Sequence, residues 1–465
     1  MAGGIIDLLA QGQNNLYLTG SPQITHFKSV YKTHTNFSME SININFNRTD
    51  CNIYETTQLI AKIPRNADLV GQMYLTFELP DIISDETHKF RWAENLAEAL
   101  INDIYITIGG NKIDQMNGEF MHMMNMLTYT QDKRELFNKM TGNTIEFTNP
   151  ERFVWSRNFE NPGALKYKAT SSIRIGNEYP YSYDPSKPSI KSRTLYLPLA
   201  FWFNRDLANA LPLISLQYAE VQIVITLNPI SHIYKIFYYR GGVPNYYAPS
   251  LVNPNHGLHN FVSNTYKKYL ISYSVLDMKL SLEANYIFLD EKERRFFAYK
   301  PVEYLINQVR IIPFRSLKEN NSLELVLVNP VKEIMWVCKR NDQALYNNWF
   351  DFTDNLNNIL VSTKILFNGI ERLREKPWEF FNNLQAFQHH RGISKEGLFL
   401  YSFAINPDEF QPSGSCNMSK INRIQFVLTL RNPVSAYYEY DCNFYTVNYN
   451  ILRIANGLGG LVFAL

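Results

Sequence analysis

The chain has 465 residues, of which 45% are hydrophobic and 14% aromatic, and its formal net charge is +2. This length predicts two or three domains with sizeable cores, and the aromatic content favours strands over helices. A charge so close to zero excludes a large basic field for wrapping nucleic acid, so we expect no direct nucleic-acid binding.

The first 25 residues form a separate N-terminal arm whose short apolar patch contains Ile5, Ile6, Leu8 and Leu9. No Lys or Arg precedes the patch as in a secretory signal, and no run approaches the ~18 apolar residues of a membrane span, so we expect a soluble, cytosolic chain. The arm has two interpretations: a helical turn packed on the body, or a segment that docks on another protein or a lipid surface.

Strand patterns begin after the arm. Residues 39–46 alternate between apolar and polar, residues 72–79 end at a proline, and residues 104–108 reach a Gly-Gly turn from which the chain returns. Residues 119–127 carry four methionines, which could invite a soft metal, but a packed amphipathic helix is the better interpretation because methionine fills irregular gaps in cores.

Two long polar stretches, residues 139–193 and 240–264, are rich in Pro, Gly and Tyr. We expect ordered excursions there that lie away from the packed strands, at an outer end or between subunits. Further strands are predicted in the second half, at residues 269–289, 301–312, 323–328, 331–337, 399–405, 424–430 and 441–454.

The two halves repeat each other. Residues 222–227 (QIVITL) match residues 425–430 (QFVLTL), and each follows a strand that a proline-containing break interrupts. A second pair matches residues 102–126 to residues 284–297, each reading strand, turn and helix. An offset of about 180 to 200 residues indicates a duplicated domain rather than a solenoid repeat. We therefore predict an N-terminal arm at residues 1–25, a first domain at 26–228 and a second at 229–465.

Catalytic and metal-binding constellations are hard to find. Phosphate-loop, zinc-protease and serine-hydrolase motifs do not occur, and we expect no cofactor, metal or enzymatic activity. His389 and His390 are interpreted as a surface or loop pair, since adjacent side chains on a strand point apart. Asp408-Glu409 is an acidic pair that nothing in the sequence selects.

Cysteines and sequons are few. Cys51, Cys338, Cys416 and Cys442 have no C-x-x-C or zinc-ligand spacing, so we interpret them as reduced core thiols. Without a signal peptide, the N-glycosylation sequons are interpreted as chance matches; they occur at Asn36, Asn47, Asn320 and Asn417.

Several segments resemble the major capsid proteins of nucleocytoplasmic large DNA viruses. The most specific is Gln411-Pro-Ser-Gly-Ser-Cys-Asn-Met-Ser419. The resemblance spans almost the whole chain and is weakest in the polar excursions. The other segments that carry it are residues 4–6, 17–25, 27–28, 35–37, 201–205, 210–213, 284–290, 293–295 and 448–453.

The resemblance implies an all-β fold of two tandem eight-stranded antiparallel jelly-roll sandwiches, with short helices in the loops between strands. It also implies a homotrimeric, pseudo-hexagonal capsomer that tiles the icosahedral shell of a large double-stranded DNA virus, assembled in a virus factory in the host cytoplasm. The expected partners are neighbouring capsomers, minor capsid proteins, a penton protein and an inner membrane. The alternative is a carbohydrate-binding or hydrolytic β-sandwich protein, because jelly rolls host those functions too.

Overall fold

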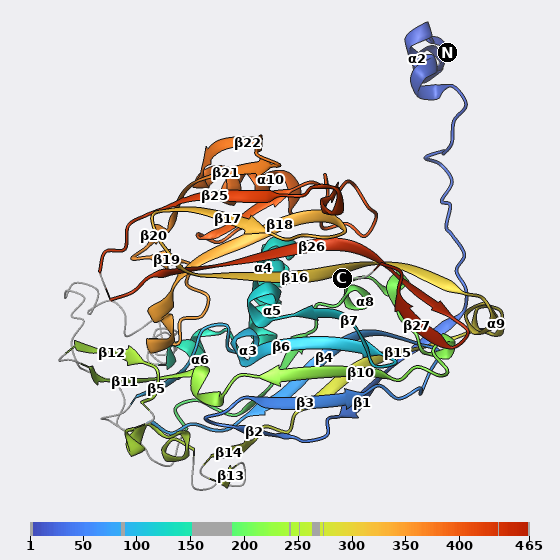
Figure 1. Cartoon of the computed structure of the whole chain (residues 1–465). Helices are drawn as coiled ribbons and strands as arrows, with labels where there is room; N and C mark the ends of the chain where they lie inside the picture. Colours follow the sequence, from blue (N-terminus) through green and yellow to red (C-terminus); the bar gives the residue numbers. More distant parts are fainter. Residues whose placement is uncertain are drawn as a thin grey trace. The chain divides into compact units, whose positions relative to one another are not determined.

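A computed structural model describes residues 3–84, 89–150, 188–240, 243–250, 252–262, 270–272, 274–435 and 437–463. The chain divides into two compact units, Met1–Phe37 and Ser38–Leu465 (Figure 1).

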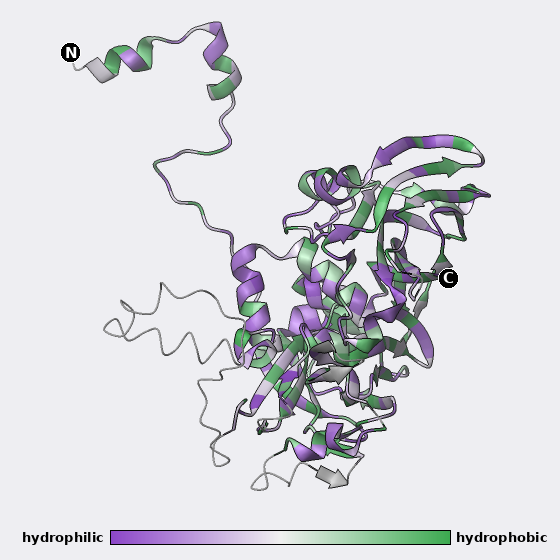
Figure 2. Cartoon of the chain, turned by 90° about the vertical axis from the view of Figure 1, so that its left-hand side faces the viewer, coloured by the Kyte–Doolittle hydropathy of each residue, from purple (hydrophilic) through white to green (hydrophobic). Residues whose placement is uncertain are grey.

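The N-terminal unit contains two short helices, α1 (Gly3–Leu9) and α2 (Gln13–Thr19), followed by an irregular segment up to the first strand. No residue of either helix is buried. Figure 2 shows apolar and polar stretches side by side on both helices. Helices of seven residues are marginal in water without tertiary packing, so these two need a surface to pack on.

The first sandwich of the larger unit consists of two four-stranded antiparallel layers. One layer has the order β1-β15-β4-β8, with the short β9 beside β4, and the other has the order β3-β10-β6-β7. Their bounds are β1 Phe37–Asn45, β3 Thr57–Lys62, β4 Leu69–Leu79, β6 Ile101–Ile108, β7 Asn111–Met116, β8 Arg193–Pro198, β9 Leu211–Pro212, β10 Val221–Leu227 and β15 Ser281–Leu289.

The second sandwich repeats this plan. Its layers have the orders β16-β26-β18-β23 and β17-β25-β21-β22, with β24 beside β18 and β27 beside β26. The bounds are β16 Val302–Leu317, β17 Asn320–Leu325, β18 Pro330–Arg340, β21 Leu360–Phe367, β22 Ile370–Pro377, β23 Leu398–Ser402, β24 Cys416–Asn417, β25 Ile424–Leu430, β26 Tyr440–Ala455 and β27 Leu458–Leu461.

Both sandwiches have the strand order of a jelly roll. If the eight main strands of each are counted along the chain, one layer has the order first, eighth, third, sixth and the other has the order second, seventh, fourth, fifth. The predicted all-β fold of two tandem jelly rolls is confirmed.

Helices and small sheets occupy the loops. The helices are α3 Leu96–Leu100, α4 Gly118–Thr128, α5 Gln131–Thr141, α6 Ile145–Thr148, α8 Trp202–Arg205, α9 Glu291–Tyr299 and α10 Gln385–His389, the last preceded by a π-helical turn, Phe380–Leu384. The small strands are β2 Asp50–Asn52, β5 Phe90–Trp92, β11 Tyr234–Arg240, β12 Val243–Tyr247, β13 Leu270–Ser272, β14 Val275–Asp277, β19 Thr353–Asp354 and β20 Asn357–Asn358.

Of the two pairs of segments that the sequence analysis matched between the two halves, one pair occupies equivalent positions in the two sandwiches. Strands β10 and β25 are the seventh strands of their sandwiches, and each lies between the second and fourth strands. In β25 every second side chain is buried, beginning at Ile424, as the alternation predicted. The second pair is wrong, because β6 is the fourth strand of the first sandwich and β15 is its eighth.

The predicted border at residues 228 and 229 is wrong for the same reason. Strand β15 lies beyond it and pairs with β4, with Ala284 opposite Met73 and Leu282 opposite Leu75. The eighth strand of a jelly roll lies between the first and the third, so the first sandwich is complete only at Leu289. Helix α9 then leads to the second sandwich.

The polar excursions are only partly described. Residues 151–187 of the first excursion lie outside the described residues, so the position expected for that part stays a prediction. At its described ends, Phe147 and Ile190 are buried in the core of the first sandwich, so the expectation that the excursion lies away from the packed strands is wrong there. In the second excursion, Leu258, Phe261 and Val262 are buried in the core of the first sandwich. The expectation that this excursion lies away from the packed strands is wrong for these residues.

The interior of the second sandwich is an aromatic core around Trp336. Its indole packs against the rings of Phe381, Phe399, Phe426 and Phe444, with centroid distances of 5.2 to 5.9 Å. Edge-to-face and offset ring pairs add to the burial of apolar area. This cluster joins both layers, since Trp336 lies on β18 and Phe426 on β25.

Phe426→Ala is expected to lower the free energy of unfolding by about 3 to 5 kcal/mol, because it leaves a cavity between the layers. The matched control is Tyr437→Ala, at an aromatic side chain that is 96% exposed, with an expected change within about 0.5 kcal/mol. Urea unfolding followed by circular dichroism measures both. Equal effects would contradict the assignment of Phe426 to the core.

Candidate functional site: the seam between the two jelly rolls

The two sandwiches pack against each other through two different kinds of surface, and we call this contact the seam. The first sandwich contributes the side where its fifth and sixth strands are joined, with edge strand β7 and helix α4. The second contributes the outer face of the layer β16-β26-β18-β23. Figure 1 shows β7 and α4 between the sandwiches, beside β16.

Helix α4 contacts the second sandwich through polar groups at its N-terminus. Asn117 caps the helix by accepting a hydrogen bond from the Phe120 amide at 2.9 Å, and its Nδ2 donates to the hydroxyl of Tyr445 at 3.2 Å. The Glu119 carboxylate accepts hydrogen bonds from Lys339 Nζ at 2.7 Å and Asn443 Nδ2 at 3.0 Å. These bonds set the position of α4 on strands β18 and β26.

A continuous apolar core underlies these contacts. The cluster that fills the first sandwich extends through α4 to the outer face of the second and includes its Met335, Val337, Leu398 and Leu400, all fully buried. Strand β18 is therefore buried on both faces, which explains why its sequence is apolar almost without alternation.

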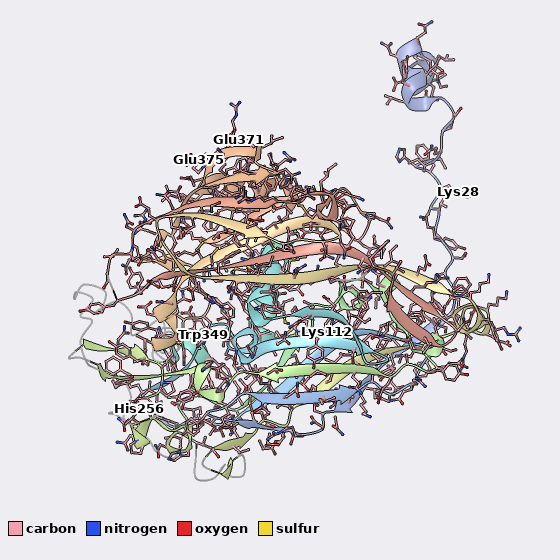
Figure 3. All side chains as sticks on the ribbon, in the orientation of Figure 1. Lys28, Lys112, His256, Trp349, Glu371 and Glu375 are labelled. Carbon is pink, nitrogen blue, oxygen red and sulfur yellow. The ribbon has the colours of Figure 1, made fainter. Side chains whose placement is uncertain are left out.

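The loop between β18 and β19 of the second sandwich forms hydrogen bonds with the first sandwich. Trp349 Nε1 donates a hydrogen bond to the His232 carbonyl at 2.8 Å, and the amide of Asn347 donates to the carbonyls of Ser231 and Tyr234, both at 2.7 Å. Figure 3 shows Trp349 between the two sandwiches. Asn347 has a φ of 49°, a left-handed conformation that asparagine tolerates better than most residues.

Asp114 on β7 is a buried carboxyl at the seam. Its Oδ1 accepts hydrogen bonds from the amides of Val309 at 3.2 Å and Gln115 at 2.9 Å. Burial raises the pKa of Asp114 to about 7, although these two hydrogen bonds oppose the rise. The group therefore titrates near neutral pH where the two sandwiches touch.

A second buried ionic cluster lies on the same face of the second sandwich. His390 Nδ1 donates to Asp408 Oδ1 at 2.8 Å, and its Nε2 lies 3.1 Å from Glu333 Oε2. Lys332 Nζ donates to the Pro407 carbonyl at 2.7 Å and lies 4.0 Å from the Glu333 carboxylate. Two positive and two negative groups thus balance one another inside the protein.

The protonation of this cluster follows from its contacts. Burial alone would lower the pKa of His390, but the carboxylates of Asp408 and Glu333 outweigh burial and raise it to about 9. Burial raises the pKa of Glu333, and His390 and Lys332 more than offset that, so the net shift is downward. At neutral pH His390 is therefore a cation that joins β18 to the loop after β23.

The structure corrects the prediction for one of the two adjacent histidines. His390 has a fully buried side chain, so the interpretation of a surface or loop pair is wrong for it. The two carboxylates that hold it lie on opposite sides of the imidazole and do not converge on one point. Within the described ranges, no group of three or more His, Cys, Asp or Glu side chains could hold a metal ion.

The sequence did not identify Asp114, Glu333 or His390 as important. The available signal was the pair Lys332-Glu333 directly before the apolar residues 334–338 of β18, which predicts charges that must find partners. The predicted docking residues of the arm remain accessible: Ile5, Ile6, Leu8 and Leu9 are between 47% and 75% exposed. None of the helices in the described part of the chain has the length and apolarity that a membrane crossing demands.

Comparison with known families accounts for both halves of the chain. A model described as "Major capsid protein N-terminus" matches residues 25–290, and one described as "Large eukaryotic DNA virus major capsid protein" matches residues 293–460. The chain belongs to this family of major capsid proteins. The two matches meet at α9, where the strand order also places the border between the jelly rolls. The role of this capsid protein is therefore structural, and the carbohydrate-binding or hydrolytic alternative is not favoured.

Relatives cover the full length of this capsid protein. It is 30% identical to the major capsid protein of Phaeocystis pouchetii virus and 28% identical to that of Paramecium bursaria Chlorella virus 1, over all of each chain. Among solved structures, a quasi-atomic model of the PBCV-1 virus capsid matches with a TM-score of 0.68 and 24% identity, covering 95% of this chain and 100% of that one. The Faustovirus major capsid protein matches with a TM-score of 0.66 and 13% identity, covering 96% and 94%.

His390→Gln is expected to lower the free energy of unfolding by about 3 to 5 kcal/mol at pH 6.5, because it leaves two buried carboxylates without their cation. The folded-state pKa of about 9 lies above the ordinary 6.5, so the stabilisation is complete below pH 6.5 and is lost as pH rises through 9. Urea unfolding at pH 6.5 and 9.5 measures this. The neighbouring His389→Gln serves as the control, and a similar loss in both variants would refute the cluster's role.

Asp114→Asn is expected to flatten the pH dependence of stability between pH 4 and 7. The raised pKa of Asp114 means that folding takes up a proton in this window, so the wild-type protein loses stability as pH rises. At pH 8 the variant should be more stable by a few kcal/mol, since one unit of pKa shift corresponds to about 1.4 kcal/mol. Chemical unfolding across this pH range tests it, and parallel curves for the two proteins would contradict the assignment.

Proposed function

We propose that three copies of this capsid protein form a pseudo-hexagonal homotrimer that tiles the icosahedral shell of a large DNA virus. The observation that supports the proposal is that the seam between the jelly rolls is directional, which means that the two jelly rolls contribute different surfaces to it. One sandwich contributes a side and the other contributes a face, and in a single chain only one of each is used.

The unused side belongs to the second sandwich. Its edge strand β22 is the counterpart of β7 and is exposed along nearly its whole length, whereas the second half of β7 is largely buried at the seam. Figure 3 shows Glu371 and Glu375 of β22 at the margin of the molecule. The helical segment that follows β22 exposes Leu384 by 42% and Phe387 by 86%.

The unused face belongs to the first sandwich, on the layer β1-β15-β4-β8. Its outward side chains are only partly buried, as at Gln72 and Tyr74 on β4, and Tyr196 on β8 is 38% exposed. On the equivalent face of the second sandwich, Met335 and Val337 are fully buried by the seam. The first five residues of β1 are all exposed. Because alternate side chains of a strand point to opposite faces, both faces of this part of β1 are uncovered.

A contact between the unused side of one copy and the unused face of the next repeats the seam between chains. A heterologous contact of this kind forms a closed ring when its rotation is a simple fraction of a turn. Three chains then place six similar sandwiches around one axis. Such a block has six similar outer sides, so neighbouring capsomers meet through nearly equivalent contacts.

We propose a second role for the N-terminal unit, as an attachment point. We propose that its apolar helix α1 binds components on the inner face of the shell: a minor capsid protein, a penton protein or an inner membrane. Burial of its four large apolar side chains would contribute a few kcal/mol per copy at roughly 25 cal/mol per Å². A shell repeats this contact many times, so weak single contacts suffice.

Purified protein at micromolar concentration should have three times the mass of one chain by native mass spectrometry. The contact should bury well over the ~2,000 Å² at which obligate interfaces begin. Leu384→Asp with Phe387→Asp should yield folded monomers, because two charges enter a desolvated contact. The control is Leu356→Asp, at a leucine that is 89% exposed on another loop. A monomeric wild-type protein would overturn the trimer, and a trimeric double variant would overturn this choice of surface.

Replacement of Ile5, Ile6, Leu8 and Leu9 by Ser should leave the trimer intact and reduce the content of inner-face proteins in purified particles about tenfold or more. Deletion of residues 1–12 should have the same effect. The matched control replaces four polar residues of the same unit, Gln11, Gln13, Asn14 and Asn15, by Ser. Loss of trimers in the apolar variant would show that the arm folds back on its own subunit, and particles with a normal set of inner proteins would refute the docking role.

A further inference from the structure

Two of the four cysteines face each other inside the second sandwich. Cys338 on β18 and Cys442 on β26 are directly opposite in the antiparallel register. Both are fully buried in the core that surrounds Trp336. The thiol of Cys338 donates a hydrogen bond to the sulfur of Cys442, and the two Sγ atoms are 3.2 Å apart.

This geometry suits a covalent bond. Directly opposite residues of an antiparallel pair have Cβ atoms about 4.5 to 5.5 Å apart, close to the roughly 3.5 to 4.5 Å that a disulfide spans. To form a bond of ~2.05 Å, the two side chains must rotate and the two Cβ atoms must approach each other by up to about 1 Å, which is a small local adjustment of the two strands. The surrounding side chains are apolar, so loss of the two thiol protons leaves no buried polar group without a partner.

We propose that Cys338 and Cys442 are a disulfide-forming pair that joins the third and eighth strands of the second jelly roll. This inference does not depend on the trimer or on the arm. The bond would close a loop across 104 positions of the sequence, which restricts the unfolded chain strongly. It lies in the layer that forms the seam, so it would strengthen the sheet on which the first sandwich rests.

The oxidant is a disulfide of the thiol-exchange class, for example oxidised glutathione or a protein disulfide. One cysteine thiolate attacks a sulfur of the oxidant and releases the first reduced thiol, which leaves a mixed disulfide. The second cysteine thiolate attacks the protein sulfur of that intermediate and releases the second thiol. The pair loses two electrons and two protons, and the oxidant gains them.

Burial controls when this exchange occurs. Burial raises the pKa of Cys442 well above its ordinary value, and the hydrogen bond with Cys338 adds to the rise, so the reactive thiolate is rare in the folded protein. Exchange therefore takes place while β18 and β26 are still open to solvent. Once folding is complete, the bond is protected from reduction by the same core.

The remaining cysteines supply the controls. Cys51 is buried on β2 in the first sandwich, and Cys416 is half-buried on β24, where it pairs with Val331. The predicted burial in a core is confirmed for Cys51, Cys338 and Cys442, while Cys416 lies at the margin of a core. The proposed bond revises the prediction of reduced thiols for Cys338 and Cys442 and leaves it in place for Cys51 and Cys416.

The test counts free thiols in full-length protein after refolding in a buffer of reduced and oxidised glutathione. Denaturation with an alkylating agent should label two cysteines per chain instead of four, and mass spectrometry should find a linked peptide that contains Cys338 and Cys442. The oxidised protein should melt roughly 5 to 10 °C higher than the reduced protein. Cys51→Ala should retain the linked peptide and the shift in melting temperature, and Cys442→Ala should lose both.

Wild-type protein that labels at all four cysteines after equilibration would overturn the proposal. So would stable glutathione adducts on Cys338 or Cys442, or a linked peptide that contains Cys51 or Cys416. An oxidised protein that melts no higher than the reduced one would also overturn it, because the bond would then strain the sheet rather than support it. The thiol count needs no variant, so it decides the question even if Cys442→Ala fails to fold.

Discussion

The apolar core that runs from the first sandwich into the outer face of the second is the constraint on which this structure depends. Two β-sandwiches joined by a short helix would ordinarily move relative to each other, because each can bury its own core. Here Met335, Val337, Leu398 and Leu400 of the second sandwich belong to the core of the first. Neither sandwich can move away without exposing these side chains, so both belong to the one compact unit Ser38–Leu465.

Buried polar groups determine how the two sandwiches are positioned relative to each other at this apolar contact. An apolar face alone tolerates sliding, whereas a hydrogen bond in a desolvated place is costly to lose. Glu119 with Lys339, and Trp349 with the His232 carbonyl, each join one sandwich to the other at a defined point. The cluster around His390 acts within the second sandwich, where it ties the loop that carries Asp408 to strand β18.

The directional seam also connects fold to assembly. A duplicated domain whose two copies meet side to face necessarily leaves one side and one face uncovered. In this capsid protein those surfaces are β22 with its following helix, and the outer face of the layer that contains β4. In the trimer that we propose, contacts between chains reuse the geometry already present within a chain.

The sequence by itself determined the local elements and the family. Alternation at Ile424–Leu430 predicted a strand with one buried face, and the matching segment at 222–227 revealed the duplication, because side-chain period depends only on neighbouring residues. The tertiary structure decided what depends on distant pairing: that Ser281–Leu289 returns to the first sandwich beside β4, that β18 is buried on both faces, and that His390 lies between Glu333 and Asp408. A charged or apolar residue specifies only that it needs a partner, and which partner it meets is set by strand order and register across hundreds of residues.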